Sequence, residues 1–173
     1  KALVTGGSVG IGKACATALA MAGADVAIVD IDEATGTKTA AGIRAMGVDS
    51  IFVECDVTSR EQVQAMVATV VAKFGRLDIG INNAGIAILG GDEDLGQQAW
   101  DRVIDVNLTG VWLCAQAEAQ QMIKQGPEGG KIINTASMSA RIANCNASYD
   151  ASKAGVVHMT RTLAAEWGRF NIN

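Results

Sequence analysis

The sequence predicts an α/β protein built on a doubly wound parallel sheet. Short apolar runs with the length of buried strands alternate with longer stretches in which apolar residues recur at helical spacing. Hydrophobic residues make up 49% of the 173 residues and charged residues only 18%, which is typical of one domain with a sizeable core. We therefore expect residues 1–173 to form a single domain.

The first helix and the two strands beside it follow from the first 30 residues. The apolar run 2–4 leads into the glycine turn Thr5–Gly12, a helical pattern continues up to Gly23, and residues 26–29 form a second apolar run. Strand, glycine turn, helix and strand in this order form a unit that binds dinucleotides. The glycines let a pyrophosphate approach the backbone, and the helix N-terminus offers it N–H groups and a positive dipole end. The candidate cofactor-binding residues of this turn are Gly6, Ser8, Gly10, Ile11 and Gly12.

An acidic residue ends the second predicted strand. Asp30 lies 18 residues after Gly12, at a position where a carboxylate accepts hydrogen bonds from the diol of a ribose. A 2′-phosphate would bring further negative charge against Asp30, and residues 31–33 supply no basic partner for it. We therefore predict NAD, rather than NADP, as the cofactor.

The remaining elements continue the alternation. Further helices are expected at residues 32–46, 58–74, 97–125 and from Ser148 onwards, and further strands at 51–53, 78–81 and 131–134. Thr58 and Glu61 have the spacing of a capping box at the start of the second of these helices. Ligands of such sheets bind beyond the carboxyl ends of the strands. The candidate residues at that edge are Gly6–Gly12, Asp30, Asp56, Asn82–Gly85 and Ser137.

Charge and cysteine usage exclude several classes of partner. The net charge is −4 and no cluster of Lys or Arg occurs, so nucleic acids and anionic membranes are poor partners. No apolar run is long enough to span a bilayer. The four cysteines are widely spaced and form no CxxC or CxxH pattern, so we expect neither a metal site nor a disulfide. Reduced thiols favour a cytoplasmic location.

The stretch Ser148–Lys153 is a second candidate for chemistry. Tyr149 is the only tyrosine, and Lys153 follows four residues later, so a helix would place both side chains on one face. An ammonium group near a phenol favours the phenolate, which can exchange a proton with an alcohol or carbonyl oxygen. Taken alone, such a pair also arises by chance, and Asn107 inside its predicted helix could be an ordinary polar surface residue. His158, the only histidine, is expected to be structural.

Together these segments resemble the short-chain dehydrogenase/reductase family over the whole chain. Thr5-Gly6-xxx-Gly10-Ile11-Gly12 is similar to the family's TGxxxGIG turn, and Tyr149-xxx-Lys153 resembles its YxxxK motif. Asp56-Val57 is similar to its adenine-side aspartate, Asn82–Gly85 to its NNAG strand end, and the segment around Asn107 to its catalytic-asparagine helix. The resemblance implies a Rossmann-type sheet with strand order 3-2-1-4-5, and the family's C-terminal strands are expected to be missing.

The resemblance implies hydride transfer between NAD(H) and a secondary alcohol or ketone. Tyr149 would be the general acid/base, and Lys153 would favour its phenolate and hold the nicotinamide ribose. Ser137 would stabilise the substrate oxygen. Asn107 would hold a water that links Lys153 to solvent. After the fifth strand the family often has Ser-Ser-x-x-Gly where this chain has Ala-Ser-Met-Ser-Ala, so Ser139 remains an alternative to Ser137. The cofactor-binding residues that the resemblance adds are Asp56, Val57, Asn83, Ala84, Gly85, Tyr149 and Lys153.

Three functions stay open at this point. The first is an NAD-dependent dehydrogenase, because residues 136–142 resemble the family's polyol and sugar dehydrogenases. The others are an NADPH-dependent ketoreductase, for example of 3-oxoacyl chains, and a dinucleotide-binding regulator without catalysis. The resemblance also implies a homo-oligomer, a dimer or tetramer, formed by the helices around Asn107 and Tyr149. The chain begins and ends abruptly at expected strands, so we expect a fragment that alone binds NADH weakly and turns over little substrate.

Overall fold

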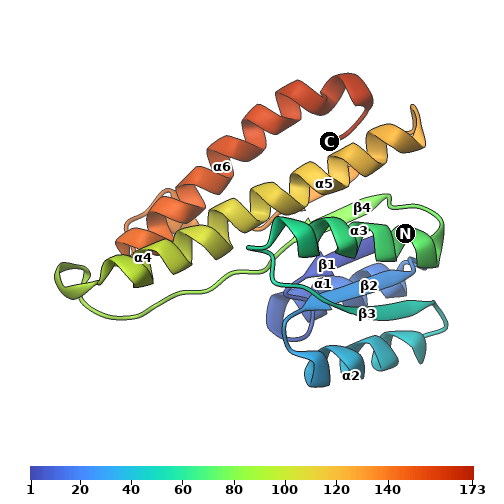
Figure 1. The fold of residues 1–173 in the computed structure, drawn as a ribbon, viewed down its shortest axis with the longest axis horizontal. Coiled ribbons are helices and arrows are strands. Elements are labelled where there is room, and N and C mark those ends of the chain that lie inside the picture. Colours follow the sequence, from blue (N-terminus) through green and yellow to red (C-terminus); the bar gives the residue numbers. More distant parts are fainter.

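Five parallel strands form the centre of the molecule in the computed structural model, which describes residues 1–173 (Figure 1). The strands are β1 (Ala2–Thr5), β2 (Val26–Asp30), β3 (Ser50–Glu54), β4 (Ile79–Asn82) and β5 (Lys131–Asn134). Their order in the sheet is β3-β2-β1-β4-β5, with every pair parallel. This confirms the predicted fold class and strand order. Beside β5, Ile172 forms an isolated parallel bridge with Gly130.

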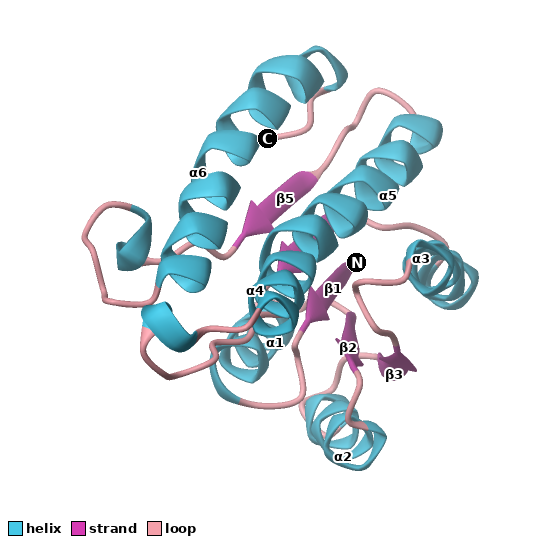
Figure 2. Cartoon of the chain, turned by 60° about the vertical axis from the view of Figure 1, so that its left-hand side comes forward, coloured by secondary structure: helices cyan, strands magenta, loops and turns pink.

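Helices cover both faces of the sheet (Figure 2). One face carries α1 (Gly10–Met21) and α2 (Glu33–Arg44), and the other carries α3 (Arg60–Phe74), α5 (Gly110–Gln125) and α6 (Ala147–Trp167). Short 3₁₀ turns lie at Asp92–Asp94, Met138–Ala140 and Gly168–Phe170. None of the helices combines the length and the apolar character needed to cross a bilayer.

The strand β1 shows why the strands are continuous apolar runs in the sequence. Ala2 and Val4 pack in the core on the side of α1 and α2, whereas Leu3 packs in the core on the side of α3 and α5. Successive side chains of a strand point to opposite faces of the sheet. Because helices bury both faces, Ala2, Leu3 and Val4 are all apolar, and only Thr5 at the end of the strand is polar.

One long helix changes its winding near the middle. The helix α4 (Gln97–Ile104) continues through a π-helical turn, Asp105–Thr109, into α5, and Figure 1 shows them as one rod with α6 beside it. The predicted helix 97–125 is therefore confirmed as continuous. The π turn, which accommodates one extra residue, has no signature in the apolar spacing of the sequence. It contains Asn107, whose side chain is fully buried rather than on the surface.

The start of α3 differs from the prediction. Ser59, not Thr58, is the N-cap, and its Oγ accepts a hydrogen bond from the backbone N–H of Gln62 at 3.3 Å. Thr58 instead donates its hydroxyl and its backbone N–H to Asp56, at 2.8 and 2.9 Å. The predicted capping box of Thr58 and Glu61 is therefore wrong, because the carboxylate of Asp56 binds Thr58 and the helix starts one residue later.

A carboxyl group is buried between α5 and the sheet. Glu118 is fully buried and accepts a hydrogen bond from Nδ2 of Asn82 at 3.0 Å. Gly80 leaves the space for it, since a Cβ atom at that position would overlap the carboxyl group. Burial raises the pKa of Glu118 to about 8, against the effect of the hydrogen bond from Asn82. Nδ2 of Asn82 also donates to Asn134 on β5, so the carboxyl group belongs to a polar chain that crosses two strands.

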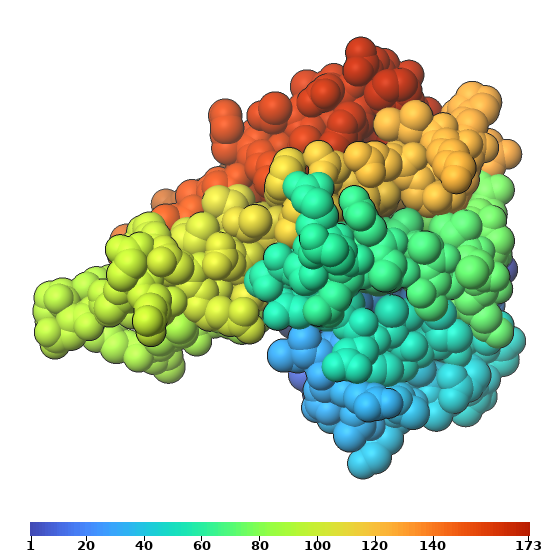
Figure 3. Space-filling view, viewed as in Figure 1, coloured from blue at the N-terminus to red at the C-terminus, as the bar shows by residue number.

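The residues that follow β4 project from the body of the molecule. Figure 3 shows the segment around residues 85–100 extending away from the sheet and its helices. This segment contains the 3₁₀ turn Asp92–Asp94 and leads into α4. Because it leaves the sheet at the carboxyl end of β4, it passes along the edge where ligands of such sheets bind.

Candidate active site

A cleft of about 940 Å³ opens at the carboxyl ends of the strands. This volume lies at the upper end of the range for cofactor and small-molecule sites. The predicted site residues that line the cleft are Gly6, Gly10, Ile11, Asp30, Asp56, Val57, Asn83, Ala84, Gly85, Ser137, Tyr149 and Lys153. Ser8, Gly12 and Asn107 are buried and do not line it. The structure thus places twelve of the predicted residues in the lining of one cleft, and the other three, Ser8, Gly12 and Asn107, are buried outside that lining.

The glycine turn forms one wall of the cleft at the N-terminus of α1. A Cβ atom on Gly6 would lie 2.9 Å from Cα of Ala84, and one on Gly12 would overlap the carbonyl oxygen of Gly6. Close packing therefore requires glycine at both positions. No side chain caps α1, and its first turn has no acidic residue, so free N–H groups and the positive dipole end remain available to a ligand. These features fit the pyrophosphate of a dinucleotide.

Asp30 lines the cleft beside this turn. Its carboxylate accepts hydrogen bonds from the backbone N–H groups of Ser8 at 3.1 Å and Ile31 at 2.8 Å. It forms no salt bridge. The backbone therefore fixes the carboxylate, which retains further lone pairs for a ligand. This geometry suits the predicted contact with a ribose diol.

Asp56 follows β3 at the same edge of the sheet. Besides the hydrogen bonds from Thr58, it has Nη1 of Arg102 on α4 at 4.0 Å from its Oδ2. Burial opposes ionisation of the carboxyl group, but the hydrogen bonds from Thr58 and the charge of Arg102 outweigh burial, so the pKa of Asp56 lies below its usual value. Sequence reasoning missed Arg102, because its approach to Asp56 depends on how α4 packs over the cleft.

Asn83 attaches the end of β4 to the glycine turn. The backbone N–H groups of Asn83 and Ala84 donate to Oγ1 of Thr5 at 3.0 and 3.1 Å. Nδ2 of Asn83 donates to the carbonyl oxygens of Thr5 and Gly6, both at 3.3 Å. The side-chain amide of Asn83 is thus used within the protein to hold two strand ends together.

Tyr149 and Lys153 lie one turn apart on α6, and both line the cleft. Nζ of Lys153 donates to the carbonyl oxygen of Thr135 at 2.8 Å and lies 5.7 Å from the centre of the Tyr149 ring. Lys153 is only 3% exposed and forms no salt bridge. Burial lowers the pKa of Lys153. With one protein acceptor, the ammonium group keeps donors for a ligand.

Asn107 stands behind this pair of residues. Its Oδ1 accepts a hydrogen bond from the backbone N–H of Ile86, and its Nδ2 donates to the carbonyl oxygen of Ile86, both at 2.8 Å. Nδ2 also donates to Oγ of Ser152 at 3.2 Å. A Cβ atom on Gly85 would lie 3.3 Å from Oδ1 of Asn107 and 3.5 Å from Nζ of Lys153, so these three residues meet. The role of Asn107 in holding a relay water stays a prediction.

Ser137 and Ser139 both line the cleft. Oγ of Ser137 accepts a hydrogen bond from the backbone N–H of Ser139 at 3.1 Å and so caps the 3₁₀ turn Met138–Ala140. This contact fixes the oxygen of Ser137 and leaves its O–H free to donate to a substrate. The geometry supports the choice of Ser137, which stays a prediction.

Two contacts at the start of α6 escaped sequence reasoning. Asn146 caps the helix, since its Oδ1 accepts a hydrogen bond from the backbone N–H of Tyr149 at 3.1 Å, and its Nδ2 donates to the carbonyl oxygen of Ile88 at 2.9 Å. The backbone N–H of Ala147 donates to Oδ1 of Asp92 at 3.0 Å. An asparagine just before a helical pattern is a cap signal that the sequence offers. The partners lie 58 and 55 residues away, and no local pattern indicates them.

The cysteines take no part in a metal site. All four are free, and no group of three His, Cys, Asp or Glu side chains is arranged to hold a metal ion. Cys55 lines the cleft. Burial, with a smaller effect from the charge of Asp56, raises the pKa of the Cys55 thiol to about 11. This thiol therefore stays protonated at neutral pH.

The fold and the cleft define a dinucleotide-binding α/β protein with a tyrosine and a lysine at its site. Residues 1–173 match the family described as short chain dehydrogenase, and the chain belongs to this family. This confirms the predicted resemblance. The chain is 43% identical over 169 residues to D-threitol dehydrogenase of Mycolicibacterium smegmatis, an alignment that covers 96% of this chain and 64% of that protein.

Other relatives have different names. A 3-oxoacyl-[acyl-carrier-protein] reductase of Synechocystis is 41% identical over 167 residues, covering 95% of this chain and 67% of that protein. A solved structure of NAD⁺-bound xylitol dehydrogenase has a TM-score of 0.95 at 36% identity, covering 99% of this chain and 66% of that one. The chain thus spans about two thirds of the length of these relatives.

Proposed function

We propose that this protein is an oxidoreductase that transfers a hydride between NAD(H) and a secondary alcohol or ketone. One arrangement carries the proposal: Tyr149 and the buried ammonium group of Lys153 share a cleft with a glycine turn that fits a pyrophosphate. Burying a cation without a counter-charge is unfavourable. A regulator that only binds a dinucleotide could use this cation to hold a ribose, but it has no need of a phenol beside the cation that can exchange a proton, so the arrangement favours an enzyme.

Each residue of the cleft has a role that its contacts allow. A bound nicotinamide would supply the acceptor or donor of the hydride. Tyr149 would take the proton from the alcohol oxygen during oxidation and return it during reduction. Lys153, held by Thr135, would favour the phenolate of Tyr149 and donate to a ribose hydroxyl. Ser137 would donate its O–H to the substrate oxygen, and Asn107 would hold the water that passes the proton to solvent.

The charges at the edge of the cleft suit NAD better than NADP. Asp30 carries a negative charge where a 2′-phosphate would come closest, and residues 31–33 offer no Lys or Arg to balance it. Asp56 would accept a hydrogen bond from the adenine amino group, with Val57 beside the ring. The related xylitol dehydrogenase, whose solved structure is the NAD⁺-bound form, supports this choice.

A polyol or a sugar is the proposed substrate. Its hydroxyl groups need several hydrogen-bond partners, and Ser137 and Ser139 contribute polar side chains to the cleft. The names of the threitol and xylitol dehydrogenases support this class. The alternative, a 3-oxoacyl reductase, draws support from the Synechocystis relative and from Ile86 and Leu89, whose apolar side chains would suit an acyl chain.

Turnover by the full-length protein would decide between these functions. NAD and NADP would each be supplied with a panel of polyols, and NADH and NADPH with ketones, sugars and acyl thioesters. We expect the highest kcat/KM for NAD with a polyol, and loss of that activity in Tyr149→Phe. A preference for NADPH with acyl thioesters would establish the alternative. Tight NADH binding without turnover of any compound would establish a regulator.

We also propose a cytoplasmic homo-oligomer, a dimer or a tetramer. The helices α5 and α6 run side by side and form one long outer surface (Figure 1). All four cysteines are free, which suits a reducing compartment. Light scattering of the full-length protein at micromolar concentration would measure its mass in solution, and a monomer would contradict the oligomer.

A further inference from the structure

The segment 86–92 contributes a wall of the cleft and is hydrogen-bonded to the start of α6. Ile86, Ala87, Leu89 and Gly90 line the cleft, and Leu89 is 88% exposed. Asn107 binds the backbone of Ile86 at the near end of this segment. Beyond Ile86, the hydrogen bonds that join the segment to another element all go to α6 and its cap.

Asn146 joins this wall to the catalytic helix through one side-chain amide. Its Oδ1 accepts hydrogen bonds from the backbone N–H of Tyr149 at 3.1 Å and from Oγ of Ser148 at 3.2 Å. Its Nδ2 donates to the carbonyl oxygen of Ile88 at 2.9 Å. Asn146 is only 9% exposed, so water competes little for these bonds. The two ends of a planar group thus bind the backbone of Tyr149 and the backbone of the wall.

Asp92 makes a second connection between the same two elements. The backbone N–H of Ala147, the first residue of α6, donates to Oδ1 and Oδ2 of Asp92 at 3.0 and 3.1 Å. A carboxylate at this position satisfies an N–H group that the helix leaves free and interacts favourably with the helix dipole. At the start of α6, the N–H of Tyr149 therefore binds the cap residue Asn146, and the N–H of Ala147 binds Asp92 of the wall.

We propose that Asn146 and Asp92 are positioning residues that hold the wall 86–92 at a fixed distance from the hydroxyl of Tyr149. The inference rests on the proposed function, because the wall and Tyr149 bound the space that a substrate would occupy. Asp30 and Asp56, two of the proposed cofactor contacts, lie on other elements of the cleft. We therefore expect the two tethers to affect the substrate more than the dinucleotide.

The variant Asn146→Asp removes the hydrogen bond to Ile88 but keeps the cap of α6, so it tests the tether alone. The aspartate keeps an oxygen that accepts from the backbone N–H of Tyr149, so α6 remains capped. It replaces the donor to Ile88 by an oxygen, which repels the carbonyl group. We expect the melting temperature to stay close to that of the wild type, while kcat/KM for the substrate falls by about 10- to 100-fold, the scale on which a misplaced site loses activity. The KM for NAD should stay unchanged.

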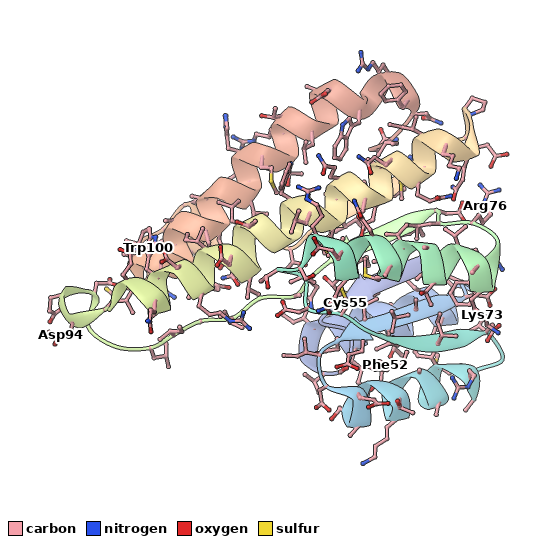
Figure 4. The ribbon with its side chains drawn as sticks, in the orientation of Figure 1. Phe52, Cys55, Lys73, Arg76, Asp94 and Trp100 are labelled. Atoms are coloured by element: carbon pink, nitrogen blue, oxygen red, sulfur yellow. The ribbon has the colours of Figure 1, made fainter.

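Asp92→Ala tests the second tether, and Asp94→Ala is its matched control. Asp94 lies in the same 3₁₀ turn at the tip of the projecting segment (Figure 4), and its side chain has no hydrogen bond to another element. Asp92→Ala should lower kcat/KM for the substrate and change the preference among polyols of different length, whereas Asp94→Ala should change neither. The double variant Asn146→Asp/Asp92→Ala should lose less than the sum of the two single losses, because both tethers hold one wall.

Hydrogen exchange of the full-length protein gives a readout that does not depend on turnover. The backbone N–H of Ala147, which donates to Asp92, should exchange faster in Asp92→Ala, and that of Ile86, the one N–H of the wall with an acceptor, should exchange faster in both variants, while peptides from the middle of α6 keep their wild-type rates. Unchanged exchange in the wall, or an unchanged preference among polyols in an active enzyme, would overturn the proposal. A wild-type protein without any NAD-dependent turnover would overturn the proposed function instead, and the exchange rates would still decide for or against the tethers.

Discussion

The ammonium nitrogen of Lys153 lies 5.7 Å from the centre of the Tyr149 ring, one turn away along α6. The carbonyl oxygen of Thr135 holds it there, and no carboxylate neutralises it. The cation is therefore free to act on the phenol and on a ligand. Under the proposed function the two residues would have separable roles, because Tyr149 would exchange the proton with the substrate, whereas Lys153 would serve both proton transfer and cofactor binding.

Tyr149→Phe should lower kcat by about 10²- to 10⁴-fold, the usual contribution of a positioned acid or base. The ring remains, so the Kd for NADH should stay close to the wild-type value. Steady-state kinetics and a fluorescence titration with NADH would measure the two quantities. A variant that kept most of its turnover would show that the proton travels through another group.

Lys153→Met should weaken NADH binding and lower kcat together, because it removes both proposed contacts. Burial lowers the pKa of Lys153, so its ammonium form is lost at a lower pH than in an exposed lysine. The wild-type kcat/KM should therefore fall on the alkaline side as the cation disappears. Lys153→Arg, whose cation does not titrate in this range, is the control. If Lys153→Arg keeps any activity, the fall of its kcat/KM at alkaline pH should occur at a higher pH than in the wild type. A fall at the same pH in both proteins would assign the titration to another group.

Asp30→Ser should shift the cofactor preference from NAD towards NADP. A hydrogen bond to a charged group is worth about 1.5–3 kcal/mol, so the ratio of kcat/KM for the two cofactors should change by roughly 10- to 100-fold. Glu33→Gln removes the same charge from an exposed residue three positions later and should leave the ratio unchanged. An equal shift in both variants would mean that net charge, and not a contact with Asp30, sets the preference.

Glu118 should make the folded state less stable at alkaline pH. Burial raises its pKa from the ordinary 4.5 to about 8, so between these values the folded chain holds a proton that the unfolded chain has released. The free energy of unfolding then falls as the pH rises through this window, by up to about 1.4 kcal/mol per pH unit, and the contribution is flat below and above it. Glu118→Gln is neutral throughout and should remove this slope. Urea denaturation at several pH values would measure the free energy of unfolding of the wild type and of Glu118→Gln. The same dependence on pH in the two proteins would contradict the assignment.

Gly80→Ala and Gly42→Ala should have opposite effects on stability. A Cβ atom at Gly80 would overlap the carboxyl group of Glu118, and forcing extra atoms into a packed core costs about 1–3 kcal/mol. Gly42 lies in α2 with open space around the added atom, so alanine should stabilise the helix by roughly 0.5–1 kcal/mol. Thermal denaturation of both variants would test this. A stable Gly80→Ala would mean that the Glu118 side chain can move aside.

The fold could be predicted from the sequence because its strands are short and largely apolar, and because they alternate with helices that end at or near glycines. The glycine turn and Asp30 belong to one local unit, so their meeting at one cleft also follows from the chain order. The start of α3 was harder to predict, because Thr58 and Ser59 are adjacent cap formers and only the position of Asp56 decides between them.

Contacts between distant parts of the chain had no local signal. Asn146 is visible as a cap in the sequence, but its partner Ile88 is set by the path of the segment after β4. Likewise, the burial of Glu118 depends on the missing side chain of Gly80, which lies on another element. A single sequence shows that these residues exist and does not show that they touch.

The π turn Asp105–Thr109 makes the long helix sensitive to the insertion or deletion of a single residue. One residue corresponds to about 100° of rotation in an α-helix, so the extra residue of the turn sets the angular phase of α4 relative to α5. On one side of the turn Arg102 faces Asp56, and on the other side Glu118 faces the sheet. Deleting one residue from this turn would leave the composition of the helix almost unchanged but would rotate one of these two faces away from its partner. A deletion here should therefore do more damage than most single substitutions in the same turn.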